Sequence, residues 1–417
     1  MILCVAAGGV YLTGAGRSYG YDESVTVGGF VATPSLLDPF RRQIVFNNHP
    51  LFSFLEHVIW SAGGRSETWM RLLPALFAAA TVGIIGWWGA RRWCAVAGLA
   101  AGGVLAVNPL FVDAARSVRG YSLVALCAVV STIMTVQLVE RGERRSWSVA
   151  YVVATAAGLA VHFYMAFVLA GIVVFVAARG KVTEGWRLRW FASALFGSLA
   201  YLGLFDAMFA ASQLRGRSVR LSFPLEAARD LLGTRAMAVV SLALVVAAIA
   251  LVSGRRREVV LPALAVGGLL TFVWLVLAPI DLYPRFLVWL VPGVAVCVGR
   301  AVARWRVALV PAAVAIVAMI GTWAGSLGGD KMALPKAAAL VEATRAGGGT
   351  PCAIGAEALL AYTTPPRDVT DLTDIDSCDV VVVIASGVPA AAALERPGSG
   401  FPAVTTLPGT GVVVLSR

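Results

Sequence analysis

The chain has 417 residues, of which 59% are hydrophobic and 14% are charged, and its net charge is +11. Ordinary soluble domains carry roughly a quarter charged residues, so this composition excludes a soluble protein and predicts a polytopic membrane protein. The positive charge does not indicate nucleic-acid binding, because the arginines separate apolar runs, as loop anchors do, instead of forming one basic stripe.

Apolar runs along the chain predict about eleven membrane spans, since a transmembrane helix needs about 20 apolar residues. The first run begins at Met1 without a basic flank, which leaves open a start further upstream. It also lacks the basic region and cleavage site of a signal peptide, so we expect a retained helix. The expected spans lie near residues 1–15, 69–89, 93–111, 121–139, 147–161, 163–178, 189–209, 237–253, 258–279, 285–299 and 306–327.

The apolar stretch 147–178 is too long for one span, because a single helix of this length would measure about 48 Å against a roughly 30 Å hydrocarbon core. Basic residues flank it on both sides, at 141–145 and at 179–181. Basic flanks favour the cytoplasm, so both ends are expected inside and the stretch should turn back at 162–164. The same rule places inside the arginines near 91–92, 187–189, 255–257 and 300–306.

The remaining loops are then expected outside the membrane: 16–68, 112–120, 162–164, 210–236, 280–284 and the tail from about 328. They carry arginines against the positive-inside rule. Each one alone could extend to lipid headgroups, but as a set they predict an anionic ligand on the outer face. These arginines are Arg41, Arg42, Arg116, Arg119, Arg215, Arg217, Arg220 and Arg285.

The first outer loop contains a short amphipathic pattern that starts at Leu51. Its polar positions Ser53, Glu56 and His57 fall on one helical face. The other face is apolar, and the segment is too short and too polar to span. We therefore expect a helix that lies in the membrane interface. The apolar positions are Leu51, Phe52, Phe54, Leu55, Val58 and Ile59.

The adjacent acids Asp22 and Glu23 follow the first expected span. Such a pair is more often a solvated turn, but it suits glycosyl transfer, in which a carboxylate accepts the proton of the acceptor hydroxyl. A lipid-phosphate leaving group departs as an anion and needs a cation. Arginine fits that role because its planar fork pairs with phosphate oxygens.

Several motifs lie on the expected outer face, in order along residues 15–300. They are Asp22 with Glu23, the run 48–51, the run 71–74, Asn108 with Pro109, the run 115–123, the run 162–164 and the run 283–286. Together they resemble the GT-C superfamily of membrane glycosyltransferases. Within it they are similar to the bacterial branch related to protein O-mannosyltransferases and to the aminoarabinose transferases of lipid A.

The resemblance implies roles for individual residues. In that family the acidic pair carries the general base, and the donor is a polyprenyl-phosphate sugar. Asp22 is thus the implied base and Glu23 a second essential carboxylate, with Arg119 and Arg285 as ligands of the donor phosphate. Further candidates for substrate binding are His49, Arg116, Tyr121, His162 and Tyr283.

The chain also departs from the family pattern. Many relatives have a second acid immediately before the arginine-tyrosine motif, where this chain has Ser117 or Val118, and Asp113 is out of register. His49 is open to donor, acceptor or metal binding, or to fixing a proline turn. A histidine at the apex of a hairpin, such as His162, more often has a structural role than a catalytic one.

The tail beyond residue 328 changes character. A helix-like stretch at 335–346 ends in the glycines 347–349, and the apolar runs 380–384 and 411–415 are typical of buried strands. We expect a small extracytoplasmic α/β domain over 328–417, without a nucleotide-binding loop or a catalytic triad. The membrane domain, 1–327, is expected to be all-α and to include the outer loop 16–68.

Cys352 and Cys378 are the only two cysteines of this tail. If the tail is outside the cytoplasm, they lie where disulfides persist. A bridge between them is therefore a hypothesis, with the alternative that Cys378 points into a core.

The leading hypothesis is a multi-pass plasma-membrane glycosyltransferase with its active site on the outer face. Its expected partners are a polyprenyl-phosphate sugar, membrane lipids and an acceptor that is a lipid, a glycan or a protein, and not nucleic acid. The sequence requires no cofactor, and a divalent metal stays open without support. Alternatives are a lipid or sugar transporter, which would favour ionisable or broken segments at mid-membrane, and a non-enzymatic assembly protein, which would place no demand on Asp22.

Overall fold

The computed structural model describes residues 2–42, 48–204, 284–324, 333–364, 366–368, 377–384, 403–406 and 412–416. The chain divides into two compact units, and each is described by itself. The helical unit contains Met1–Thr13, His49–Phe52 and Arg71–Leu327, and the α/β unit contains Gly14–Asn48, Ser53–Met70 and Gly328–Arg417. The first loop thus groups largely with the tail, which differs from the expected division into 1–327 and 328–417.

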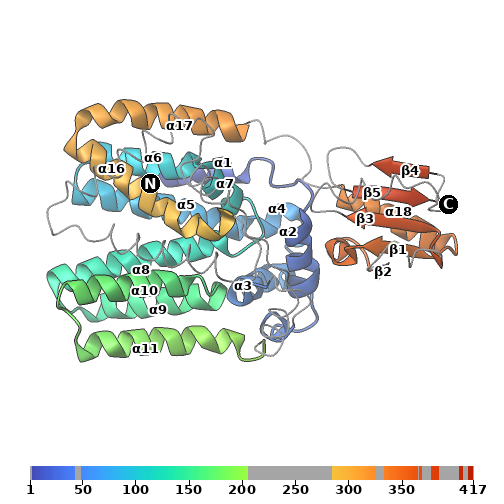
Figure 1. Ribbon diagram of the computed structural model, residues 1–417, viewed down its shortest axis with the longest axis horizontal. Coiled ribbons are helices and arrows are strands. Elements are labelled where there is room, and N and C mark those ends of the chain that lie inside the picture. Colours follow the sequence, from blue (N-terminus) through green and yellow to red (C-terminus); the bar gives the residue numbers. More distant parts are fainter. Residues whose placement is uncertain are drawn as a thin grey trace, which may run out of the picture. The chain divides into compact units, whose positions relative to one another are not determined.

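The helical unit is built from the apolar runs. Among the described residues, α8, α9, α10 and α11 pack side by side, and α6 packs against α5, α16 and α17 (Figure 1). The helices are α1 (Ile2–Leu12), α5 (Leu72–Arg92), α6 (Ala95–Val107), α7 (Pro109–Ala115), α8 (Tyr121–Arg141), α9 (Arg145–Val161), α10 (Met165–Ala178), α11 (Glu184–Ser198), α16 (Val291–Arg304) and α17 (Leu309–Ala324), with the 3-10 turns η3 (Leu199–Tyr201), η4 (Pro284–Leu290) and η5 (Arg306–Ala308).

Helix length does not confirm eleven spans. Within the described residues, Glu67–Arg92, Tyr121–Arg141 and Arg285–Arg304 are long and apolar enough to cross a membrane, and α6 with α7 forms a fourth if this pair, bent by 66°, is one span. The bend has a local cause, because Pro109 disfavours helical geometry at Asn108. The Asn108 side chain instead accepts a hydrogen bond from the Phe111 amide at 3.1 Å and caps α7. The expected spans 237–253 and 258–279 lie outside the described residues.

Glycines let the helices of this unit approach closely. A Cβ at Gly98 in α6 would lie 2.3 Å from the carbonyl oxygen of Gly86 in α5. A Cβ at Gly299 in α16 would lie 2.8 Å from the Ala101 Cβ in α6. Lipid provides little hydrophobic drive for helix association, so such close packing has to supply the contact energy.

The helix ends that the charge pattern assigns to the cytoplasm meet one another. Arg92 at the end of α5 forms two hydrogen bonds, of 2.8 and 2.7 Å, with Glu140 at the end of α8. Arg189 of α11 pairs with Glu143, in the connection between α8 and α9, and with Ser148, in the first turn of α9. These helix ends therefore share one side, and the identity of that side stays a prediction.

The break expected at 162–164 is present. Helix α9 ends at Val161 and α10 begins at Met165. A Cβ at Gly158 would lie 2.8 Å from the Met165 Cγ, so the residues after the break pack back against the end of α9. The stretch 147–178 is two helices, as its length and flanking charges indicate.

The α/β unit contains a five-stranded sheet in the order β2-β1-β3-β5-β4, with β1 parallel to β2 and β3, and β5 antiparallel to β3 and β4 (Figure 1). The strands are β1 (Pro351–Ile354), β2 (Arg367–Asp368), β3 (Val380–Ile384), β4 (Ala403–Thr406) and β5 (Val412–Ser416). Its helical elements are α2 (Tyr21–Thr26), the π-helix η1 (Val27–Val31), η2 (Asp38–Phe40), α3 (Pro50–Ser61), which crosses the boundary between the units, α4 (Glu67–Met70), α18 (Leu334–Ala346) and η6 (Ala356–Leu359).

Strand β3 is apolar throughout because both of its faces are buried. Val382 lies in one core with α18, and Val381 lies in a second core on the other face. The second core contains the disulfide between Cys352 in β1 and Cys378, whose Cα atoms are 5.8 Å apart. The hypothesis of this bridge agrees with the structure.

Candidate active site

Three aromatic side chains from distant parts of the sequence meet in the helical unit. His49 precedes α3, Tyr121 opens α8, and His162 follows α9. Ring centroids are 5.1 Å apart for His49 and Tyr121, and 4.9 Å for His49 and His162. The guanidinium carbon of Arg119 lies 5.5 Å from the centroid of the Tyr121 ring, and its Nη2 is 3.4 Å from the Tyr121 hydroxyl. We call these four residues the His-Arg-Tyr cluster.

Gly120 makes this meeting possible. A Cβ at this position would lie 2.4 Å from a Val161 methyl group and 3.2 Å from Nδ1 of His49. Any larger residue would therefore separate the start of α8 from the end of α9 and from the His49 ring. His49 and Arg119 are buried, with exposed fractions of 1% and 4%. The local sequence thus brings a cation and two imidazoles into a poorly hydrated place.

Both histidines of the cluster are neutral. Burial, together with the charge of Arg119, lowers the pKa of His162 to about 3, and the same causes place the pKa of His49 well below its usual range. Nδ1 of His162 accepts a hydrogen bond from the Tyr164 amide at 3.2 Å, so Nε2 carries the proton. Nδ1 of His49 is buried and has no hydrogen-bond partner among the described residues. A neutral imidazole can donate a hydrogen bond to an anion through its N–H group, and it adds no positive charge beside Arg119.

Arg285 belongs to the same surroundings. Its charge contributes to the lowered pKa of His49. The next residue, Phe286, packs against Tyr164 with ring centroids 5.2 Å apart, so η4 lies beside the turn that carries His162. Arg119 and Arg285 are therefore the two cations of the expected site that the structure brings to the histidines. Tyr283, Arg215, Arg217 and Arg220 lie outside the described residues.

Arg116 is placed differently. Its Nη2 donates to the Thr13 carbonyl at 2.7 Å, and its own carbonyl accepts from Nε of Arg71 at 3.1 Å. Both arginines are fully or almost fully buried. Arg116 thus connects the end of α1 with the start of α5, a structural role that sequence reasoning did not assign. Arg71 begins the run 71–74 of the resemblance, and sequence reasoning did not predict that it would be buried and bonded to Arg116.

The acidic pair lies in α2, in the α/β unit. Oε2 of Glu23 accepts a hydrogen bond from the Gly20 amide at 2.9 Å, so this carboxylate caps the helix. Glu23 is 2% exposed, whereas Asp22 is half-buried. The two acids are therefore not equivalent. Glu23 holds the start of α2, and Asp22 is the more accessible carboxylate.

Helix α3 has its polar face turned inward. Nδ1 of His57 donates to the Val31 carbonyl at 2.7 Å, and Ser53 donates to Oδ1 of Asn48 at 3.0 Å. Glu56 is fully buried, and its carboxylate oxygens have no hydrogen-bond partner among the described residues. Burial raises the pKa of Glu56 well above its usual range.

The apolar face of α3 is the more open one. Val58 is 47% exposed, and Phe54, Leu55 and Ile59 are half-buried, although Phe52 is buried. This orientation suits an interfacial helix. The pattern could show that the helix is amphipathic, but it could not show which face turns inward or that Glu56 has no hydrogen-bond partner in the described part of the chain.

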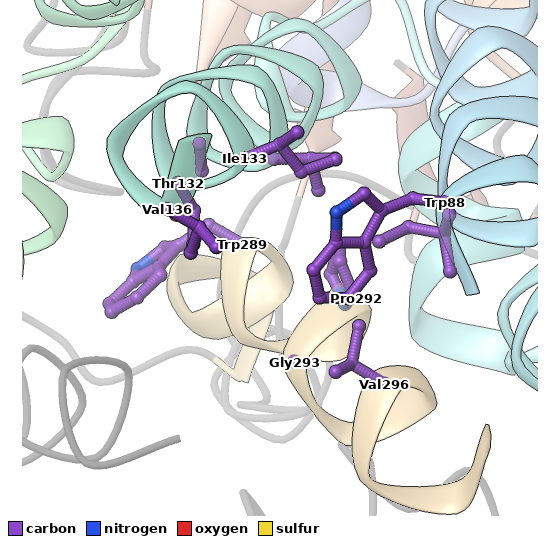
Figure 2. A pocket seen from close by; sticks show the side chains of 11 residues that line it. Trp88, Thr132, Ile133, Val136, Trp289, Pro292, Gly293 and Val296 are labelled. Atoms are coloured by element: carbon purple, nitrogen blue, oxygen red, sulfur yellow. The ribbon is translucent and has the colours of Figure 1, made fainter. Parts of the chain in front are cut away.

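An apolar pocket lies between α5, α8, η4 and α16, deeper in the helical unit (Figure 2). It has no ionisable lining residue. Thr132 and Val136 of α8 line one side, and Trp289 and Val296 line another. Along α8 the pocket begins about two helical turns after Tyr121 and ends about four turns after it, or roughly 10–22 Å at 1.5 Å per residue. Within the described residues, no group of three His, Cys, Asp or Glu could hold a metal ion.

Comparisons with known proteins give a family model that matches part of the chain and solved structures of similar fold. Residues 47–206 match a family model described as dolichyl-phosphate-mannose-protein mannosyltransferase. The fold is similar to that of ArnT from Cupriavidus metallidurans in the apo state, with a TM-score of 0.64 at 15% identity, over 100% of this chain and 97% of that chain. ArnT from the same organism, bound to undecaprenyl phosphate, gives 0.64 at 14% identity with the same coverage. No curated protein sequence matches the chain.

The resemblance to the GT-C superfamily is thereby confirmed. The matched stretch contains His49, Arg119 and His162, which meet in the cluster, and the fold is similar to that of ArnT.

Proposed function

We propose that this chain, which has an ArnT-like fold and part of the mannosyltransferase signature, is a membrane glycosyltransferase of the GT-C type. It would move a sugar from a polyprenyl-phosphate donor to a lipid, glycan or protein acceptor on the outer face of the plasma membrane. The observation that carries this proposal is the cluster of Arg119 with neutral His49 and His162, built from motifs of the resemblance.

In this proposal the cations bind the donor phosphate. Arg119 and Arg285 pair with its oxygens, and the His162 Nε2 proton is available as a further donor. The carbon–oxygen bond between the sugar and the phosphate breaks, and the lipid phosphate leaves as an anion that the two arginines stabilise. Charged pairing is strong here because the cluster is buried and poorly hydrated.

The acceptor hydroxyl needs a base, and Asp22 takes that role in the proposal. It accepts the proton as the new bond forms at the anomeric carbon. Glu23 keeps α2 in place, since its carboxylate accepts from the Gly20 amide. Asp22 is favoured over Glu23 because it is more accessible.

A lipid-linked donor also needs apolar space. Tyr121 and Arg285 stand at the start of the elements whose later turns line the apolar pocket. A long isoprenoid chain could run from the cluster along α8 into that pocket. ArnT has been solved with undecaprenyl phosphate, which supports a donor of the same class for this chain.

The outer-face location rests on charge and redox chemistry. The arginines at the joined helix ends favour the cytoplasm, and the Cys352–Cys378 bridge favours an oxidising compartment. A reporter fused after Arg145 should therefore signal cytoplasm, and one fused after Ser377 should signal the outside. An outside signal at Arg145 would invert the proposed topology.

Asp22→Asn tests the function directly. Purified protein in lipid nanodiscs is given radiolabelled polyprenyl-phosphate mannose or aminoarabinose, with membrane-lipid and cell-wall acceptors, and release of polyprenyl phosphate is measured. The variant should lose at least roughly 100-fold in turnover, because it keeps shape but not basicity, while still binding undecaprenyl phosphate. Asp38→Asn, in the same loop, is the matched control. Near-normal turnover by Asp22→Asn, or lipid movement without sugar transfer in the wild type, would overturn the proposal.

A further inference from the structure

The helix that carries Asp22 and Glu23 is too short to hold its own position. Helix α2 has six residues, whereas isolated helices shorter than about 12–15 residues are marginal in water. The placement of its carboxylates must therefore come from tertiary contacts. Within the α/β unit, one segment of the C-terminal region, residues 355–362, which includes η6, supplies such contacts.

The closest contact is between two backbones. A Cβ on Gly28, in the π-helix that continues α2, would lie 2.2 Å from the carbonyl carbon of Leu360 and 2.3 Å from its oxygen. No side chain fits between these two segments, so glycine is required for this approach. The contact fixes the distance between η1 and the segment after η6.

The residues immediately before and after the acidic pair both form hydrogen bonds with the C-terminal region. The Ala361 amide donates to Oγ of Ser24 at 3.2 Å, and the hydroxyl of Tyr21 donates to the Glu357 carboxylate. Tyr21 and Ser24 directly flank Asp22 and Glu23 in sequence. Ser24 is fully buried, so its loss would leave an amide without its partner.

Tyr362 adds a third connection. Its hydroxyl accepts from the Tyr19 amide at 2.7 Å and donates to Oε1 of Glu67 at 3.3 Å. The rings of Tyr19 and Tyr362 pack with centroids 5.7 Å apart. One side chain of the C-terminal region thereby joins the segment before α2 to the start of α4.

We propose that residues 355–362 of the C-terminal region form a clamp that positions the α2 carboxylates for catalysis, with Ser24, Gly28 and Tyr362 as positioning residues. The tail is then a working part of the transferase and not a separate appendage. This inference rests on the proposed role of Asp22. None of the three positioning residues touches a substrate, and each acts through the orientation of α2.

Two mild substitutions test the clamp. Tyr362→Phe keeps the ring but removes the hydroxyl, and Ser24→Ala removes the acceptor of the Ala361 amide. We expect each variant to have a kcat roughly 10- to 100-fold lower, calculated per protein molecule that binds the donor, because small displacements of a catalytic group are costly. The affinity for undecaprenyl phosphate should be unchanged. Ser198→Ala, which removes an exposed hydroxyl that donates to the Leu195 carbonyl of its own helix, is the control and should keep wild-type kcat.

Gly28→Ala is the severe version, with Gly321→Ala as its control, because nothing lies within 4 Å of a Cβ at Gly321. Should Gly28→Ala fail to fold, the two milder variants still decide. Wild-type kcat in both Ser24→Ala and Tyr362→Phe, beside an inactive Asp22→Asn, would overturn the clamp alone. Turnover by Asp22→Asn would overturn the proposed base instead. The clamp would also be contradicted if the variants lost activity only in proportion to the fraction of protein molecules that no longer bind the donor.

Discussion

The two compact units bury different kinds of ionisable side chain. The helical unit buries cations and imidazoles, with Arg71, Arg116 and Arg119 against backbone carbonyls or aromatic rings. The α/β unit buries carboxyl groups: Glu23 caps a helix start, and Glu56 has no hydrogen-bond partner among the described residues. In the proposed function the phosphate-binding arginines and the base Asp22 belong to different units, so substitutions in each unit should change different measurable quantities.

The units also differ in what holds them together. Glycines and alanines bring helices of the helical unit into backbone contact. The α/β unit depends on a sheet buried on both faces and on a covalent bridge. Perturbing the bridge should therefore affect one unit and spare the other.

The largest expected effect on stability comes from the disulfide. Cys352→Ser with Cys378→Ser should lower the free energy of unfolding of the α/β unit by about 3.5 kcal/mol, from the chain entropy of the loop. Hydrogen exchange should accelerate in β1 and β3 but not in α8. Cys94→Ser, a free and exposed cysteine, is the control. Two thiols that alkylate freely in the unreduced wild type would show that no bridge forms.

The next effect concerns donor affinity. Arg119→Ala should weaken undecaprenyl-phosphate binding by about 1.5–3 kcal/mol, roughly 10- to 150-fold, because a charged hydrogen bond to the phosphate is lost. Calorimetry or a fluorescent lipid competitor measures the Kd. Arg92→Ala, at the opposite helix ends, should leave it unchanged. Unaltered affinity in both Arg119→Ala and Arg285→Ala would mean that these arginines contact lipid headgroups instead.

A smaller effect is the pH dependence that Glu56 imposes on stability. Its pKa is raised in the folded protein, so above the usual pKa of Glu the unfolded chain releases a proton that the folded chain keeps. Stability should therefore fall with rising pH by about 1.4 kcal/mol per pH unit until Glu56 ionises in the fold. Glu56→Gln removes this slope. In thermal unfolding, the variant should therefore become more stable relative to the wild type as the pH rises from 5 to 7. Parallel profiles for the two proteins would contradict a protonated Glu56.

The smallest effect should come from filling the apolar pocket. Thr132→Phe should raise the KM for a long polyprenyl-phosphate donor by roughly threefold, through lost apolar burial, and should leave the KM for a two-isoprene analogue unchanged. Leu99→Phe, exposed on α6, is a control of similar size change. An equal rise for both donors would show that the pocket does not hold the chain.

The sequence alone predicted the membrane class, the helix break at 162–164 and the buried strand 380–384, and it offered the pairing of the two tail cysteines as a hypothesis, whereas the break at Asn108 falls inside one expected span, 93–111. These features depend on local composition and spacing, which a reader of one sequence can measure. The motifs that contain His49, Arg119, Tyr121 and His162 also pointed to one site. Charge asymmetry alone assigned them to one side, and the structure brings their rings within 6 Å.

The direction in which the side chains point, and the elements that they contact, depend on the tertiary structure. The inward polar face of α3 and the attachment of Arg116 to the Thr13 carbonyl follow from neighbours far away in the chain. The same is true of the contact between Gly28 and Leu360. Helical periodicity is equal for both orientations of a helix, and a backbone carbonyl leaves no signature in the sequence. These choices therefore depend on the packing of the whole unit.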